Sequence, residues 1–118
     1  MTTSELQATV RDQDGVAVID LAGELDSSAE AALTRAYDEA TRTGTGDVTL
    51  NFEDTKYINS TGIALIVGLL AQARAHDVGV KAVGLTDHYR EIFEITRLAD
   101  FMTIADSDDR APSAEGGQ

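Results

Sequence analysis

One stretch of the sequence, residues 47–70, restricts the fold more than any other. Val48, Leu50 and Phe52 alternate with polar residues, which is typical of a β-strand with one buried face. A short loop at residues 54–58 then leads into a segment, roughly Thr61 to His76, that is so rich in apolar residues that we expect a helix covered on most of its sides. A strand followed directly by such a helix indicates a chain in which helices pack against a sheet.

The spacing of apolar residues predicts the other elements. Alternation on both sides of the turn signal at residues 12–15 predicts an N-terminal β-hairpin. Apolar residues at helical spacing after residue 28 predict a first helix, and Ser27 and Glu30 have the spacing of a capping box at its start. Further along we expect a strand at 79–85, a helix at about 87–97 with Ile92, Phe93 and, as a third candidate, Ile95 turned inward, and a short strand or turn at 101–105.

The predicted order of elements is therefore β-β-α-β-α-β-α-β. Helical connections between the later strands favour parallel pairing, whereas the first hairpin is antiparallel. We expect a single α/β domain at residues 1–105, with a mixed β-sheet and helices packed against it. Residues 106–118 are acidic and contain almost nothing to bury, so we expect a disordered tail there.

Composition narrows the range of partners. The formal net charge of −12 disfavours nucleic acid and anionic membranes. Without cysteine the chain has neither a disulfide framework nor a thiolate metal site, and no other metal or cofactor motif is present. The first residues do not resemble a signal peptide, and no apolar stretch is long enough to span a bilayer. We expect a cytoplasmic protein that needs no cofactor.

The joint between the third strand and the apolar helix, Asn59 to Gly62, is the candidate functional site. A helix start offers unpaired N–H groups and the positive end of a dipole, so a hydroxyl there is both a natural cap and a prepared phosphate site. Capping without any regulation is the alternative reading of the same residues. The chain has no G-x-S-x-G elbow, and nothing in the sequence places a histidine beside Ser60, so we expect no enzymatic activity.

Three segments, at residues 21–26, 57–62 and 92–101, resemble the STAS domain of bacterial anti-sigma factor antagonists. The likeness extends from Leu6 to Ile104. It implies a small acidic domain that binds an anti-sigma factor, itself a serine kinase of the GHKL type, and thereby frees a sigma factor. Phosphorylation of a Ser or Thr in the family's Asp-Ser-Ser/Thr-Gly motif reverses that binding.

By this resemblance, Ser60 and Thr61 occupy the two hydroxyl positions of the motif. Family members differ in which hydroxyl accepts the phosphate, so both are candidates. Asn59 stands where an aspartate is usual, which keeps the ability to cap the helix but removes a carboxylate that would face the kinase. The residues that we expect to contact the partner are Glu24, Asp26, Asn59, Ser60, Thr61 and Gly62.

A phosphate would add about −1.5 to −2 charges to a surface where we also expect Glu24, Asp26 and Asp54. Glu24 and Asp26, which precede the first helix, have an alternative role, which is to orient that helix through its dipole. We expect Gly62 to let the partner's backbone or nucleotide-site loop come close. A phosphatase is a further expected partner, and the chain should be a monomer or weak dimer. Two other functions stay open: a STAS scaffold module in a stressosome-like or transporter-associated complex, and binding of a small nucleotide or lipid.

Overall fold

Five strands occur in residues 6–43 and 46–105, the part of the chain that the computed structural model describes, and they form one sheet in the order β1-β2-β3-β4-β5. The predicted element order and the mixed sheet are confirmed. The elements are β1 (Gln7–Gln13), β2 (Val16–Leu25), the 3-10 turn η1 (Ser27–Ala29), α1 (Glu30–Thr43), β3 (Asp47–Ile58), α2 (Ser60–Ala75), β4 (Gly79–Val83), α3 (Asp87–Ile95), the 3-10 turn η2 (Leu98–Asp100) and β5 (Thr103–Ala105).

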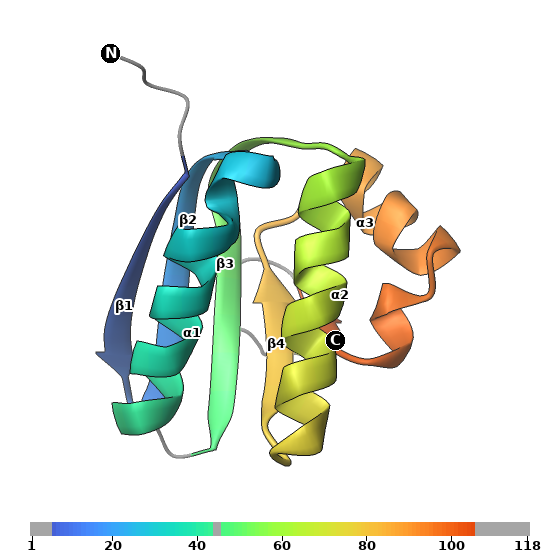
Figure 1. The fold of residues 1–118 in the computed structure, drawn as a ribbon. Helices are drawn as coiled ribbons and strands as arrows, with labels where there is room; N and C mark the ends of the chain where they lie inside the picture. The colour runs from blue at the N-terminus through green and yellow to red at the C-terminus, as the bar shows by residue number, and fades with distance from the viewer. Residues whose placement is uncertain (1–5, 44–45, 106–118) are drawn as a thin grey trace.

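Strand direction follows from the connections. β1 and β2 form the predicted antiparallel hairpin, whereas β2, β3, β4 and β5 pair in parallel. Helical crossovers join β2 to β3 and β3 to β4. In Figure 1, α1 and α2 lie side by side over one face of the sheet, and α3 lies beside α2. The result is a two-layer α/β domain.

The core lies between the sheet and these helices. Ile19, Leu50 and Ile66 have no exposed surface, and they come from β2, β3 and α2. The rings of Phe52 and Phe93 meet edge to face with their centroids 5.8 Å apart, which anchors α3 to β3. The expected inward position of Phe93 is thus confirmed.

Two boundaries differ from the expectations. Residues 54–58 were expected as a loop, but they continue β3 because β2 runs alongside them, pairing Ala22 with Asp54 and Leu25 with Ile58. The capping box at Ser27 is also wrong. The cap is Asp26, whose side chain accepts the Ser28 N–H, and a single 3-10 turn precedes α1.

The expectation that α2 is covered on most of its sides is wrong. Its buried residues are confined to one side, and Val67 on the other is 46% exposed. Among the described residues the sheet has one helical layer, so none of them forms a further layer over the outer side of α2, and several outward positions are Ala or Gly, which expose little apolar area. The expectation that Ile95 of α3 is turned inward is also wrong, since this last residue of the helix is 71% exposed.

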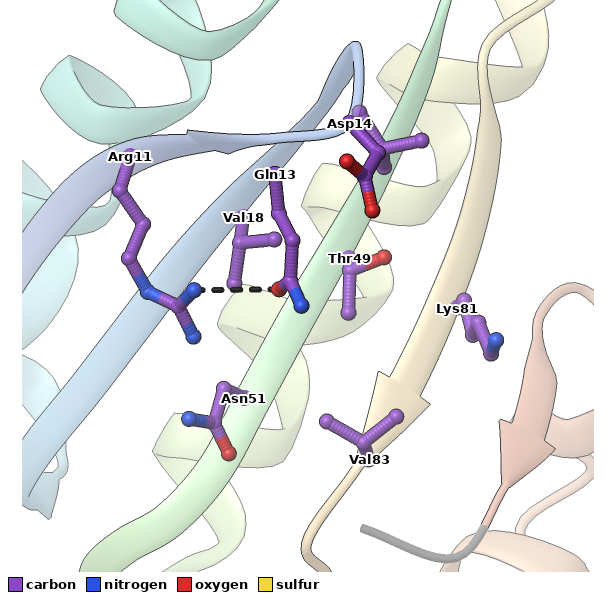
Figure 2. A pocket seen from close by; sticks show the side chains of 9 residues that line it. Arg11, Gln13, Asp14, Val18, Thr49, Asn51, Lys81 and Val83 are labelled. Carbon is purple, nitrogen blue, oxygen red and sulfur yellow. Dashed lines mark hydrogen bonds between the residues drawn. The ribbon is translucent and has the colours of Figure 1, made fainter. Parts of the chain in front are cut away.

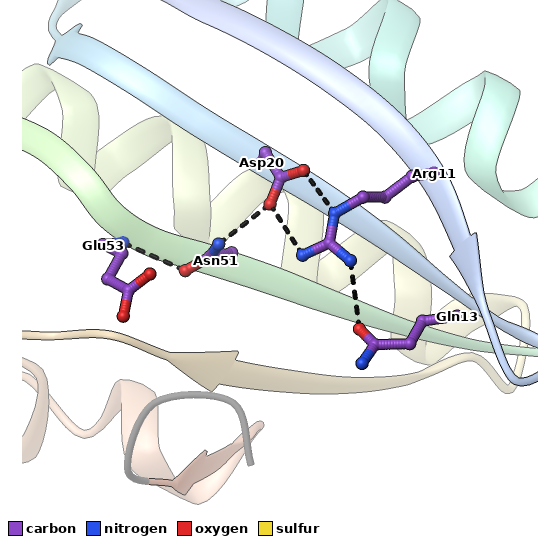
Figure 3. A network of polar contacts seen from close by, with 5 residues as sticks. All are labelled: Arg11, Gln13, Asp20, Asn51 and Glu53. Atoms are coloured by element: carbon purple, nitrogen blue, oxygen red, sulfur yellow. Dashed lines mark hydrogen bonds and ion pairs between the residues drawn. The ribbon is translucent and has the colours of Figure 1, made fainter. Parts of the chain in front are cut away.

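The opposite face of the sheet is hollowed, and both polar and apolar side chains line the hollow. The hollow holds about 240 Å³ and is lined by side chains from β1 to β4, Lys81 and Thr49 among them (Figure 2). Beside it, Arg11 forms an ion pair with Asp20 at 2.6 Å, and the Asn51 amide donates to the same carboxylate at 2.8 Å (Figure 3). Burial raises the pKa of Asp20, but these two hydrogen bonds and the Arg11 charge outweigh it and leave the pKa below its usual value.

Some predictions concern residues that are not described. The predicted tail, residues 106–118, lies outside the described residues. So does Gly44, which together with Gly46 is the stop that the sequence predicts for the first helix. Gly46 is described, and its φ of 114° is a conformation that favours glycine, in keeping with a chain turn between α1 and β3. Between residues 6 and 105, leaving out 44 and 45, no helix combines the length and apolar character needed to cross a membrane.

Candidate functional site

The candidate site lies where the C-terminal ends of β2 and β3 meet. Parallel pairing sets Leu25 opposite Ile58, so Asp26 and Asn59 are the residues that directly follow the last pair. In Figure 1 the chain turns here from β3 into the start of α2, at the same end of the sheet as the start of α1. The carboxyl ends of parallel strands are where α/β sheets usually bind ligands.

Asn59 holds the start of α2 through three hydrogen bonds. Its side-chain Oδ1 accepts the Gly62 N–H at 2.8 Å, and its backbone oxygen accepts the Ile63 N–H at 2.9 Å. Its own N–H donates to the Leu25 carbonyl at 3.2 Å, which ties the helix start to the end of β2. The expected capping ability of Asn59 is confirmed.

Gly62 is buried, and a contact within the same chain explains why this residue is a glycine. A Cβ at this position would lie 2.0 Å from the Leu25 carbonyl oxygen, far inside any permitted contact. The close approach of β2 from the same chain is therefore enough to require a glycine here, and contact of Gly62 with a partner stays a prediction.

Ser60 and Thr61 are the first two residues of α2, and both are exposed. The first N–H groups of a helix have no acceptor within the helix, and Asn59 satisfies only that of Gly62. Both hydroxyl-bearing side chains thus lie at the positive end of the helix dipole, within reach of a visiting molecule.

The two acidic residues of the candidate site differ in their surroundings. Asp26 is half-buried; the Ser28 hydroxyl donates to its carboxylate at 2.6 Å and the Ser28 N–H at 3.0 Å, and these bonds lower the pKa of Asp26. Glu24 is half-buried opposite Tyr57. Asp54 lies four residues before Ile58 in β3, roughly 13 Å along the strand. The expectation that Asp54 belongs to the surface around the joint is therefore wrong. Contact of Glu24 and Asp26 with a partner stays a prediction.

Tyr89 belongs to this site, although the sequence did not single it out. Its hydroxyl oxygen accepts the N–H of Ile58 at 3.0 Å, one residue before the cap. It thereby connects α3 to the end of β3 across 31 residues of sequence. An isolated tyrosine on a helix gives no local signal of such a contact.

Neither acid–base catalysis by His76 nor a metal site emerges from the geometry. His76 is the C-cap of the 16-residue helix that Ser60 begins, which separates the two by roughly 24 Å. Within the described ranges, 6–43 and 46–105, no group of three or more His, Cys, Asp or Glu side chains is placed to hold a metal ion.

Comparison with known protein families identifies the family to which the chain belongs. The family model described as "Mlab, STAS domain" matches residues 8–104. The chain belongs to the STAS domain family. The resemblance found in the three sequence segments is thus confirmed over nearly the whole described domain.

This STAS domain has similar relatives of known name. It is 33% identical over 92 residues to the anti-sigma-B factor antagonist of Staphylococcus aureus, covering 78% of this chain and 85% of the relative. Its fold resembles the crystal structure of an anti-sigma factor antagonist from Mycobacterium paratuberculosis, with a TM-score of 0.70, 18% identity and 87% of each chain covered. It also resembles the Bacillus cell fate determinant SpoIIAA in its phosphorylated form, with a TM-score of 0.62, 23% identity and coverage of 85% and 90%.

Proposed function

We propose that this STAS domain is an anti-sigma factor antagonist switched by phosphorylation. In the unmodified state it binds an anti-sigma factor that is also a serine kinase, and a sigma factor is released. Transfer of phosphate to Ser60 or Thr61 then dissociates the complex, and a phosphatase restores binding. The observation that carries the proposal is the exposure of both side chains at the start of α2.

Electrostatics supports the switch. A phosphate brings about −1.5 to −2 charges at neutral pH to a surface that already carries Glu24 and Asp26 beside the joint. In a docked complex this charge would lie at the contact with the partner, where repulsion and desolvation oppose binding. The formal net charge of −12 favours long-range attraction to a partner with a basic surface, whereas the switch acts locally, where the phosphate must be desolvated at the contact.

The fold tolerates this charge for a local reason. Asn59, and neither hydroxyl, supplies the cap of α2, so modification leaves the capping hydrogen bond in place. The cap is also a neutral amide, so no fixed carboxylate on the residue before Ser60 opposes a phosphate at the helix start. Phosphorylation therefore changes what the surface binds without unfolding the domain.

The comparisons support the same proposal at a coarser level. The relatives at 33% and 30% identity carry the name anti-sigma-B factor antagonist. SpoIIAA, a structural neighbour, has been solved in both an unphosphorylated and a phosphorylated form. The proposal of a non-enzymatic, cytoplasmic binding protein agrees with the names of these relatives and of this structural neighbour.

The experiment uses the full chain, purified cognate anti-sigma factor and ATP. Mass spectrometry maps the phosphate on the wild-type protein and on the Ser60→Ala, Thr61→Ala and double Ala variants. We expect one phosphate on the wild-type protein, its loss in one single variant and in the double variant, and weaker binding of an aspartate variant at the accepting position. Phosphate that persists in the double variant, or equal affinity of all variants and forms, refutes the switch.

A further inference from the structure

The exposed face of α2 continues from the phosphorylation site along the helix. Thr61, Ala64, Gly68 and Gln72 follow one another at spacings of three and four residues, so they share one face, and all four are exposed. Ala71 and Ala75 lie next to them and are exposed as well. The alanines and Gly68 in this set are small enough to allow another helix to approach the α2 backbone closely.

Gly68 has no structural reason within the described chain. It lies in the middle of α2, where glycine destabilises a helix relative to alanine. A Cβ there would have no atom within 4 Å, in contrast to Gly62, whose Cβ would meet the Leu25 carbonyl oxygen. The absent side chain leaves open space on the outer surface of α2.

A groove between α1 and α2 lies beside this glycine, and it contains an unsatisfied polar group. Tyr37 of α1 lines the groove and is only 2% exposed, and its hydroxyl oxygen has no hydrogen-bond partner in the described part of the chain. Burial, together with the charge of Asp38, raises the pKa of Tyr37, so the phenol stays neutral. A buried hydroxyl is normally hydrogen-bonded, and none of the described residues is placed to partner this one. The groove holds about 240 Å³ and is also lined by Glu30, Leu33, Thr34, Ala64, Leu65, Gly68, Leu69 and Gln72.

We propose that this α1–α2 groove is a second contact for the same anti-sigma factor, which rests on the function proposed above. The occupant is a helix of that partner, which lies along the small-residue face of α2 and inserts an arginine or lysine side chain into the groove. The cation donates a hydrogen bond to the Tyr37 hydroxyl oxygen, and Glu30 on the groove lining supplies the opposite charge.

Position and charge both favour this occupant. Thr61 lies on the same helix face as Gly68, so a partner helix that contacts the switch also passes over the groove. The acidity of the chain favours a basic side chain over an acidic or apolar one. The hydroxyl oxygen has almost no accessible area in the free protein, so entry requires a side chain at the groove mouth to rotate, which exposed side chains do within nanoseconds.

The test measures the affinity of full-length variants for the anti-sigma factor that the wild-type protein binds. Gly68→Leu fills the space needed by the partner helix, and we expect at least tenfold weaker binding, with a smaller loss for Gly68→Ala. Tyr37→Phe removes the hydrogen-bonding oxygen, and we expect roughly fivefold weaker binding. The matched control is Ala31→Leu, the same kind of change at an exposed position of α1 outside the groove lining, which should bind like the wild type.

The outcomes separate this proposal from the function on which it rests. A wild-type complex that phosphate dissociates, together with unchanged affinity of both Gly68 variants, overturns the groove and leaves the switch standing. Absence of any wild-type complex overturns both. Because Gly68→Ala should fold at least as well as the wild type, equal urea midpoints combined with weaker binding assign the loss to the contact and not to the fold.

Discussion

Alanine at the two glycines of α2 should change stability in opposite directions. At Gly62 the new Cβ would lie 2.0 Å from the Leu25 carbonyl oxygen, whereas ordinary contact begins at 3.4 Å, so the two atoms must separate by roughly 1.4 Å. The obstacle is backbone, which cannot rotate aside. At Gly68 no atom lies within 4 Å of the new Cβ.

The magnitudes follow from these contacts. Overpacking at Gly62 costs about 1–3 kcal/mol, and moving the helix start away from Leu25 breaks the 3.2 Å bond from the Asn59 N–H, which costs about 0.5–1.5 kcal/mol more. The better helix propensity of alanine returns about 0.5–1 kcal/mol, so Gly62→Ala should lower the free energy of unfolding by about 2 kcal/mol. Gly68→Ala has only the propensity term and should raise it by about 0.5–1 kcal/mol.

Urea denaturation followed by far-UV circular dichroism gives both values, with the m-value as a check that the transition remains two-state. In thermal melts, each kcal/mol corresponds to a shift of roughly 4–8 °C for a domain of this size. A Gly62→Ala variant as stable as the wild type, or a destabilised Gly68→Ala variant, would show that the packing argument at the helix start is wrong.

Three further predictions concern single contacts. Asn59→Ala removes the acceptor for the Gly62 N–H and should lower the free energy of unfolding by about 1 kcal/mol, whereas Asn59→Asp keeps the cap and should be close to neutral or stabilising in urea titrations. Tyr89→Phe leaves the Ile58 N–H without its acceptor and should cost about 1–3 kcal/mol, with faster hydrogen exchange at Ile58 as the specific readout. The pKa of Asp20 is lowered in the folded state, so the ionised Asp20 side chain stabilises the fold at pH values above its unfolded pKa near 4. This stabilisation is lost as the pH falls through the pKa of Asp20 in the folded state. Acid titrations of Asp20→Asn should therefore show less loss of stability below pH 4 than the wild type, and parallel curves would contradict this.

The sequence predicted the elements whose signals are local. Alternation and helical spacing identified the elements of the described residues in order, although 101–105 was left open as a short strand or a turn, and the Asn59 cap follows from residue type and position alone. The extension of β3 through residues 54–58 could not be predicted, because those residues become strand only through pairing with β2. The exposed side of α2 was misjudged for a related reason: a run of apolar residues does not reveal how many layers cover it.

The candidate site shows the same division. Exposure of Ser60 and Thr61 agrees with their position at a helix start, which the sequence indicates. The reason for Gly62 and the contribution of Tyr89 depend on Leu25 and Ile58, which are distant in sequence and come together only in the folded sheet. Contacts of this kind carry no periodicity and no motif within either segment.

The most direct test of the account is the dissociation constant of the complex with the cognate anti-sigma factor, measured by calorimetry for the unmodified and the singly phosphorylated protein. The account predicts that phosphate at Ser60 or Thr61 weakens binding at least tenfold, about 1.4 kcal/mol, while the circular dichroism spectrum of the domain stays the same. Equal dissociation constants for the two forms, or loss of binding accompanied by unfolding, would contradict it.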